Sequence, residues 1–443
     1  MRFLITCICA LGIGLFNLSS EVQINEPFSW PDLVFVEDGD TLYGFGGADM
    51  EPFNHEIQTF IMPFWQCFST RDLINWQFES MLDPADTWIG SSDKCFASHA
   101  VRRNDKWYWY FSNFVKSTGV VVADSPKGPW KDVLGEPLLP EDISPTHEYD
   151  KCVFVDDDGQ AYIVYGSHNK GEINYHMAEL NEDMISLKTQ PEKIEVTGDL
   201  SKAVHRPVDA PYLHKANGLY YLSWRMPYAV SENVKGPYRF VGNHEAQGHG
   251  SFFQFRNQWF VSYTTLKMDQ DYRRRYRWGS LAYVHYNDDG SIAPMEPQIR
   301  EYGVGQYEAS WDRIEAEWYV GASKGVVKKQ TDSGFEMRNL KSGDHLRYPN
   351  IHNCPPSPIV EFHYLAPQEE GCKITIHAFE PNGPVIGESA LPSTADSPTY
   401  AKGKIALQGT PPGTLTLVFV VSGTDDVELF RLNSFGILKS EEN

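Results

Sequence analysis

The stretch DDDGQAYIVYG, residues 156–166, joins a tight polar turn to a strand in which apolar side chains alternate. A glycine-containing turn followed by side chains of period two is typical of a hairpin tip and its returning strand. The same pattern recurs every 40 to 65 residues, in EDGDTLYGFGG (37–47), RNDKWYWYFS (103–112), KANGLYYLSW (215–224) and FRNQWFVSYT (255–264). Units of that length, each with room for several short strands, indicate the blades of a β-propeller.

Five such units predict a five-bladed propeller over residues 21–305. A second motif repeats between two of the units, as SPKGPW (125–130) and NVKGPY (233–238), and no sustained helical period interrupts them. After residue 305 the chain changes to short alternating strands such as CKITIHAF (372–379) and TLTLVFVV (414–421), with Pro- and Ser-rich turns between them. Residues 306–443 are therefore expected to form a jelly-roll-like β-sandwich, and the whole chain to be all-β.

The first 20 residues, MRFLITCICALGIGLFNLSS, have the single Arg, apolar run and small polar end of a secretory signal. They are too short and too lightly flanked for a membrane span, so a secreted, periplasmic or cell-surface protein is expected. The cysteines that follow are scattered and show no metal-binding spacing. We expect them to be buried thiols, with a Cys354–Cys372 bridge as the alternative; the set is Cys67, Cys95, Cys152, Cys354 and Cys372.

The composition points away from nucleic acid and towards sugar. The formal net charge of −21 repels phosphate backbones, so nucleic-acid binding is excluded. Aromatic residues make up 14% of the chain, which suits strands and also the stacking of pyranose faces on rings. An oligo- or polysaccharide is the expected partner, and we expect a monomer.

Polar residues precede each hairpin tip at similar offsets. The strand before each tip should be the innermost strand of its blade, and inner strands line the central funnel. Reading back from the tips gives Asp32, Ser98, His99, Asp150, Asp209 and His249. WPDLVF, YDKCVF and VDAPYL each place an Asp against an apolar strand, where an unpaired carboxylate is costly. Three carboxylates from three blades predict glycoside hydrolysis with inversion, in which one acid protonates the leaving oxygen and one base activates water.

The loops 46–66 and 265–278 are expected to form the rim of the funnel. They are rich in aromatic residues and Arg. We therefore expect Trp65 among the substrate contacts, together with Ser98, His99 and His249.

At these residues the chain resembles glycoside hydrolase family 43 and its five-bladed propeller clan. WPDLVF matches the context of that family's general base, which implies this role for Asp32. EYDKCVFVDDDGQAYIVYG matches the segment of the Asp that modulates and positions the acid, here Asp150. VDAPYLHKANGLYYL matches the segment of the general acid, which places Asp209 in that role. GHGSFF matches the family's fifth-blade His, here His249, and Arg277 matches a substrate-contacting Arg.

The chain departs from the family at Asp209, because the family has Glu at the matching position. Asp is one methylene shorter, which leaves three alternatives. The substrate sits deeper and Asp209 still donates the proton; His249 or His205 donates it instead; or the site binds glycan without cleaving it. The last alternative is a lectin-like propeller. The enzyme reading predicts exo-acting release of arabinofuranosyl, xylosyl or galactosyl residues from plant or algal polysaccharide, without a cofactor in the chemistry.

The C-terminal segment is similar to carbohydrate-binding module family 6. RIEAEWYVG (313–321) looks like the family's opening strand, whose carboxylates often bind structural calcium, and Glu315 and Glu317 match them. Asn433, in the closing RLNSFGIL (431–438), stands where an acidic ligand is common. Tyr348 and Tyr400 are expected in the core, with a sugar platform as the alternative. Whether this domain binds glycan or only braces the propeller stays open.

Overall fold

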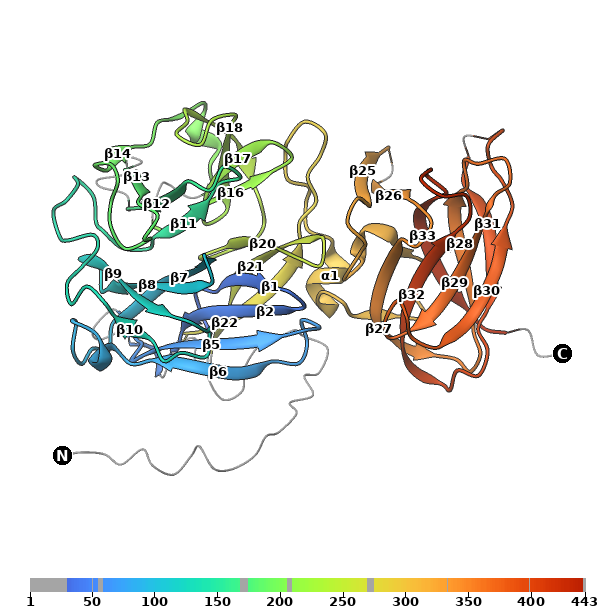
Figure 1. Ribbon diagram of the computed structural model, residues 1–443, viewed down its shortest axis with the longest axis horizontal. Helices are drawn as coiled ribbons and strands as arrows, with labels where there is room; N and C mark the ends of the chain where they lie inside the picture. The colour runs from blue at the N-terminus through green and yellow to red at the C-terminus, as the bar shows by residue number, and fades with distance from the viewer. Residues whose placement is uncertain are drawn as a thin grey trace, which may run out of the picture.

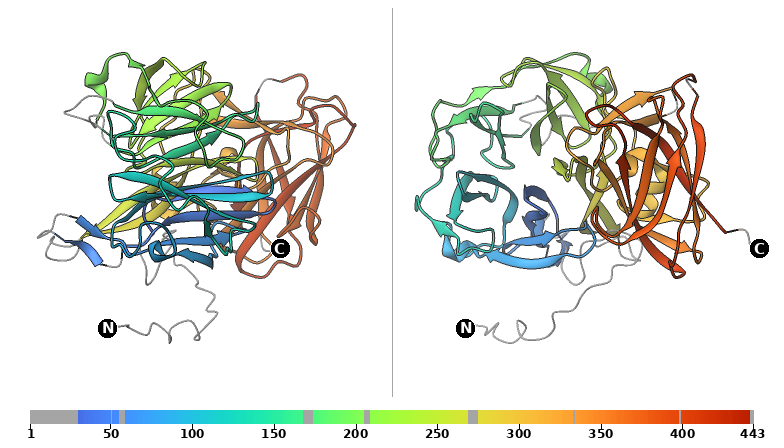
Figure 2. Two further views of the ribbon diagram at one scale, coloured as in Figure 1. Left: turned by 60° about the vertical axis from the view of Figure 1, so that its left-hand side comes forward. Right: turned by 45° about the vertical axis from the view of Figure 1, so that its right-hand side comes forward.

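The computed structural model describes residues 30–49, 51–54, 59–167, 174–204, 209–268, 275–332, 334–397 and 399–440. The predicted signal segment, residues 1–20, lies outside the described residues, as does His205. Within the described part of the chain, five blade sheets follow one another around a ring, and a two-sheet sandwich packs beside them (Figures 1 and 2). The all-β architecture predicted from the turns, a five-bladed propeller followed by a β-sandwich, is confirmed.

In each blade the antiparallel strands follow the chain outward from the innermost strand. The first blade contains β1 (Val34–Asp38), β2 (Thr41–Gly47), β5 (Trp65–Thr70) and β6 (Gln77–Leu82). The second contains β7 (Cys95–Arg103), β8 (Lys106–Asn113), β9 (Ser117–Ala123) and β10 (Lys131–Asp132). The third contains β11 (Cys152–Val155), β12 (Ala161–Tyr165), β13 (His176–Leu180) and β14 (Glu192–Lys193).

The fourth blade contains β16 (Pro211–Ala216), β17 (Leu219–Trp224), β18 (Pro227–Ser231) and β19 (Tyr238–Asn243), and β15 (Val196–Thr197) joins its outer edge in parallel. The fifth contains β20 (Ser251–Phe255), β21 (Gln258–Met268) and β22 (Arg275–Tyr283). A small hairpin of β3 (Glu51–Asn54) and β4 (Thr59–Ile61) follows β2. Short helices interrupt the blades and the linker: η1 (Pro84–Asp86), η2 (Leu200–Lys202) and α1 (Pro297–Tyr302).

The C-terminal sandwich has one sheet in the order β23 (Tyr307–Glu308), β27 (His345–Cys354), β32 (Gly413–Ser422), β29 (Cys372–Ala378) and β30 (Val385–Leu391). Its second sheet runs β25 (Val327–Thr331), β26 (Gly334–Leu340), β33 (Phe430–Leu438), β28 (Ile359–Leu365) and β31 (Ala401–Ala406). The strand β24 (Ile314–Glu315) pairs with β33, and η3 (Ala316–Trp318) follows it.

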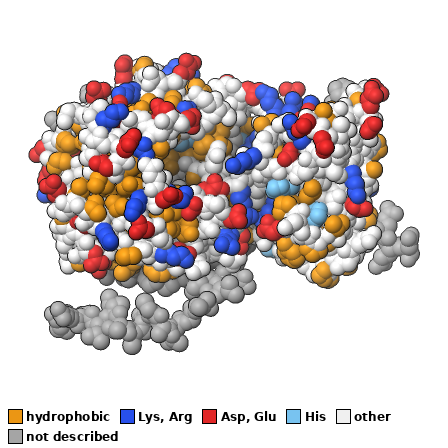
Figure 3. All heavy atoms as spheres, in the orientation of Figure 1, with side chains coloured by type: hydrophobic (Ala, Val, Ile, Leu, Met, Phe, Trp, Pro, Cys, Tyr) orange, Lys and Arg blue, Asp and Glu red, His pale blue; other side chains and the backbone are white. Residues whose placement is uncertain are grey.

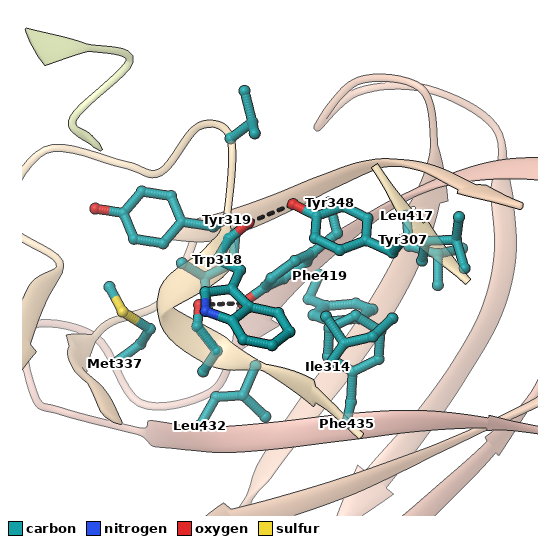
Figure 4. Close-up of a cluster of buried hydrophobic side chains, with 14 of the residues drawn as sticks. Tyr307, Ile314, Trp318, Tyr319, Met337, Tyr348, Leu417, Phe419, Leu432 and Phe435 are labelled. Atoms are coloured by element: carbon teal, nitrogen blue, oxygen red, sulfur yellow. Dashed lines mark hydrogen bonds between the residues drawn. The ribbon is translucent and has the colours of Figure 1, made fainter. Parts of the chain in front are cut away.

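The core between these two sheets is aromatic (Figure 4). Tyr348 is fully buried and its hydroxyl donates to the Ala316 carbonyl at 2.8 Å, so its predicted core position is confirmed. Tyr400 is 36% exposed, which contradicts the core position predicted for it and leaves the platform alternative. Cys354 and Cys372 are buried free thiols, like the other cysteines described, so the alternative of a bridge is wrong.

The ring closes between the first and last blades without a shared strand in the described residues. Side chains make the join instead: Ser251 Oγ and Ser262 Oγ donate to the Leu33 carbonyl at 2.6 and 3.0 Å. One hydrophobic cluster covers this seam and continues into the sandwich, through Trp30, Phe35, Phe253, Tyr283, Tyr307, Trp318 and Tyr348. The C-terminal domain therefore packs directly over the join between blades 1 and 5.

Candidate active site

The starts of all five inner strands meet around one cavity. Residues of β1, β7, β11, β16 and β20, or those just before them, line a hollow that is open to solvent. Among its lining residues are the predicted Asp32, Ser98, His99, Asp150 and His249. These residues, found by reading back from the hairpin tips, therefore line the cavity at the funnel mouth.

Two of the carboxylates stand on unusual backbone. Asp32 and Asp150 have φ values of 57° and 51°, in the left-handed region that a non-glycine residue seldom adopts. Each conformation of this kind costs about 1–3 kcal/mol and persists only where the surroundings impose it. In the fourth blade the left-handed residue is Ala210, at 63°, so the side chain of Asp209 leaves the chain one position before its counterparts.

His249 is positioned by a glycine that tolerates no side chain. Gly248 has a φ of 79°, and a Cβ atom there would lie 2.5 Å from Thr264 Oγ1. The turn brings the imidazole between two carboxylates: Nδ1 lies 3.7 Å from Asp32 Oδ1, and Nε2 lies 3.5 Å from Asp150 Oδ2. Burial alone would lower the pKa of His249, but Asp32, Asp150 and Asp209 together raise it.

Asp32 is paired with Arg277 across the ring seam. Arg277 Nη1 donates to Asp32 Oδ2 at 3.0 Å and to Oδ1 at 3.3 Å. Burial would raise the pKa of Asp32, but Arg277 and then His249 outweigh it and lower the pKa below its ordinary value. The carboxylate is thus held in its ionised form although it is only 5% exposed.

Asp150 has the opposite environment. Burial raises its pKa; Asp209 and Asp32 add to this, while His249 and Lys151 oppose it. Its Oδ2 has no hydrogen-bond partner among the described residues. Lys151, equally buried, donates to the Ala97 carbonyl at 2.6 Å, and burial lowers its pKa well below the ordinary value.

Asp209 is not among the residues that line this hollow, although its neighbour Ala210 is, and its side chain is 26% exposed. Its Oδ1 accepts hydrogen bonds from Arg225 Nε at 3.1 Å and Nη2 at 2.9 Å. Ligand atoms of Asp150, Asp209 and His249 lie within 4.8 Å of one another, the one grouping of this kind found in the described residues. A carboxyl with a lowered pKa, Asp32, beside one with a raised pKa, Asp150, is the division that acid–base chemistry needs.

Two further predicted contacts lie in the cavity and one does not. Ser98 Oγ is buried without a hydrogen-bond partner among the described residues, and burial, reinforced by Lys151, lowers the pKa of His99 to about 3. The structure contradicts the rim position predicted for Trp65. Its ring is fully buried between blades 1 and 2, and its Nε1 donates to the Phe96 carbonyl at 2.7 Å.

The sequence analysis missed Asp49, Lys151 and Arg225. Asp49 follows the end of β2, and Arg277 Nε and Nη2 bind its carboxylate at 2.9 and 2.6 Å. Arg225 interrupts the apolar run LYYLSWRMPYAV, and Lys151 directly follows Asp150 in an apolar strand. A charged residue within an apolar run was the signal that could have identified Lys151 and Arg225. The sequence analysis used this signal only for the aspartates.

Comparison with known proteins agrees with this geometry. The family model described as glycosyl hydrolases family 43 matches residues 27–292, which span all five blades. The chain belongs to family 43. It is therefore a glycosidase, and the lectin-like alternative is set aside.

Several relatives of this family 43 enzyme are named. An arabinoxylan arabinofuranohydrolase of Bacillus subtilis (strain 168) is 26% identical over 425 residues, covering 82% of this chain and 81% of the relative. An enzyme of the same name from Paenibacillus polymyxa is 24% identical, covering 82% of this chain and 65% of the relative. A beta-xylosidase of Xylanibacter ruminicola is 26% identical over 240 residues, covering 44% of this chain and 72% of the relative.

Two solved structures share the fold of the family 43 chain. A Bacillus subtilis arabinoxylan arabinofuranohydrolase, crystallised with cellotetraose, aligns with a TM-score of 0.56 at 21% identity over 96% of this chain and 99% of its own. A beta-xylosidase/alpha-arabinofuranosidase from a compost microbial metagenome, with xylotriose, gives 0.52 at 22% identity over 62% of this chain and 97% of its own.

The C-terminal domain of this family 43 enzyme matches the model of carbohydrate binding module family 6 over residues 315–439. Of the two predicted calcium ligands, Glu315 is paired with a cationic side chain of the chain itself. Arg313 Nη2 donates to Glu315 Oε2 and lies 3.4 Å from Asn433 Oδ1, so a guanidinium occupies the place of a cation. Glu317 is 3% exposed, its Oε2 has no hydrogen-bond partner among the described residues, and burial raises its pKa to about 8.

No helix in the described ranges is long and apolar enough to cross a membrane. Acidic and basic side chains are interspersed on the face drawn in Figure 3, without a continuous basic stripe.

Proposed function

We propose that this chain is an inverting, exo-acting glycosidase that removes terminal arabinofuranosyl residues from arabinoxylan. Support for the substrate comes from the relatives named above, two of which are arabinoxylan arabinofuranohydrolases aligned over 82% of this chain. Xylosyl is the second candidate, favoured by a named beta-xylosidase relative. Galactosyl is the third, since a beta-D-galactofuranosidase of Aspergillus niger is 27% identical over 264 residues.

The observation that carries the mechanism is the contrast between the carboxyl groups. Asp32 is held ionised by Arg277 and His249, which suits a general base. In the proposed step, Asp32 takes a proton from water as that water attacks the anomeric carbon. Asp209, on the other side of the sugar, gives a proton to the departing glycosidic oxygen. The carbon–oxygen bond breaks as the new one forms, so the configuration inverts.

Asp150 serves in this scheme as the partner of the acid. Its carboxylate lies within 4.8 Å of the nearest Asp209 oxygen and has a raised pKa. The negative charge of Asp209 adds to the effect of burial in raising the pKa of Asp150, so Asp150 keeps a proton close to the acid.

His249 is a weaker candidate for the acid. Both of its ring nitrogens face carboxylates, at 3.7 Å and 3.5 Å, so the charged ring holds Asp32 and Asp150 in place. The side chain of Asp209 is 26% exposed, against 22% for His249. We therefore assign the proton transfer to Asp209, with the substrate seated deep enough to reach the shorter side chain.

We further propose that the enzyme is exported, through the signal segment 1–20, and that its C-terminal domain binds glycan as well as bracing the propeller. The half-exposed ring of Tyr400 is available as a platform for a sugar face.

The function is tested with Asp32→Asn. Wild type and variant are incubated with arabinoxylan and with aryl arabinofuranosides, xylosides and galactosides, and released sugar is measured. We expect wild type to release arabinose. The variant should lose activity on every substrate, because even a good leaving group does not compensate for the loss of the general base. Unchanged rates in the variant would refute the mechanism, and release of another sugar would refute the substrate.

A further inference from the structure

The guanidinium of Arg277 is engaged on all three nitrogens. Nε and Nη2 form a two-point contact with Asp49, at 2.9 and 2.6 Å. Nη1 contacts both oxygens of Asp32, and Nη2 also lies 3.0 Å from Met62 Sδ. The ring of Phe60 covers one face of the guanidinium, with Cζ 3.8 Å from the ring centroid.

These contacts leave the group poorly placed to bind a sugar. The side chain of Arg277 is 12% exposed, and its donors already point at protein acceptors. A guanidinium in a planar two-point contact with a carboxylate is also fixed in orientation, which a single contact does not achieve. Asp49 therefore sets the plane of Arg277, and Arg277 presents Nη1 to Asp32.

We propose that Arg277, held by Asp49, is a positioning residue for Asp32 and not a substrate contact. This inference rests on the proposed role of Asp32 as general base. Arg277 lies in β22, Asp49 follows β2 and Asp32 precedes β1, so the three residues tie blade 5 to blade 1 at the ring seam. The join that closes the propeller thus also orients the base.

The charge balance at Asp32 depends on this arrangement. Positive groups that face it are Arg277 from β22, His249 before β20 and Arg225 after β17, and the buried Lys151 lies beside β11. Negative groups near it are Asp49 and Asp150. Arg277 is the strongest of the partners that lower the pKa of Asp32, so its loss should raise that pKa.

The main test is Arg277→Met, which keeps much of the side-chain volume but removes the charge and the donors. We expect kcat on an aryl arabinofuranoside to fall by about tenfold or more, because the base loses its orientation. KM should stay within about threefold. The acid limb of the kcat/KM profile should move up by about one pH unit, since Asp32 must be ionised to act. A raised KM with an unmoved limb would show a substrate contact and overturn the proposal.

Arg277→Lys tests the same proposal if the Arg277→Met variant does not fold. It retains the charge but not the planar fork. We expect its acid limb near the wild-type position and its kcat between those of wild type and Arg277→Met. A wild-type kcat with a raised KM would contradict the positioning role.

Asp49 is tested separately. Asp49→Asn removes the charge that fixes the guanidinium and should lower kcat with KM unchanged, and Asp49→Glu should restore part of the loss. Equal activity of wild type and Asp49→Asn would overturn the role of Asp49.

Two controls separate the possible failures. Ser262→Ala removes another contact across the same seam, to the Leu33 carbonyl, without touching the contacts of Arg277 with Asp49 and Asp32, so it should leave kcat and the acid limb unchanged. If Ser262→Ala shifts the limb as Arg277→Met does, the effect belongs to seam stability and the proposal fails. If Asp32→Asn stays active, the assigned base itself is wrong.

Discussion

Replacing Asp209 with Asn tests the assignment of the acid, because it removes the transferable proton while keeping the shape of the side chain. Asp209 Oδ1 accepts both bonds from Arg225, at 3.1 and 2.9 Å. An Asn carbonyl oxygen accepts the same two bonds, so the loop that carries Arg225 should stay in place. The variant therefore isolates proton donation from positioning.

The expected loss depends on the leaving group. A positioned general acid contributes about 10²–10⁴ in rate, or about 3–5 kcal/mol of barrier. For an arabinoxylan oligosaccharide, whose leaving alcohol needs the proton, we expect kcat to fall by that factor. For an aryl arabinofuranoside with an acidic phenol, which departs without a proton, the loss should stay within about tenfold.

The assay is steady-state release of arabinose from the oligosaccharide and of phenolate from the aryl substrate, at the pH optimum of the wild type. Asp156→Asn is the matched control. Asp156 is also a carboxylate paired with a basic side chain, Lys215 at 2.8 Å, but it lies at the hairpin tip after β11, away from the cavity. It should leave both rates unchanged. Equal losses of Asp209→Asn on both substrates would refute the acid role, as would no loss on either.

Three further outcomes follow from the charges. Burial raises the pKa of Glu317 to about 8, so its contribution to stability is present below about 4.5 and lost as pH rises to about 8. Glu317→Gln should therefore have the same melting temperature as wild type at pH 4.5 and a higher one at pH 8. A lower melting temperature than wild type at pH 8 would refute the raised pKa of Glu317. His249 has a raised pKa, so its stabilisation is present below its ordinary value and lost as pH rises through the native one. His249→Gln should be less stable than wild type at pH 6, with a smaller difference at pH 9, and a difference independent of pH would contradict the ion pairs. Chelation of divalent ions should leave the melting temperature unchanged, because Arg313 already faces Glu315; a fall reversed by Ca²⁺ would show that an ion displaces the guanidinium.

The sequence predicted the blades well, because each hairpin tip carries its own local signal of turn and alternation. Asp32 and Asp150 were predictable for a similar reason, since a carboxylate beside an apolar strand has a cost that needs an explanation. Reading back from the tips then placed both at one funnel mouth.

What the sequence could not supply are contacts made between blades. Arg277 meets Asp32 and Asp49 across more than 200 residues of chain, and no local pattern encodes that pairing. Trp65 was mistaken for a rim residue because it follows a loop, although the register of β5 turns its ring into the space between blades. A calcium ion was predicted at Glu315, whereas the positive charge there comes from the guanidinium of Arg313, two residues earlier.

The central claim is that Asp32 and Asp209 act on opposite faces of the sugar, and the stereochemistry of the first-formed product tests it most directly. Proton NMR of the anomeric region, recorded in the first minutes of hydrolysis of an aryl arabinofuranoside, distinguishes the two anomers before mutarotation mixes them. The account predicts that the released sugar first appears with the configuration opposite to that of the substrate. Release with retained configuration would contradict it, because retention requires a carboxylate that attacks the anomeric carbon itself.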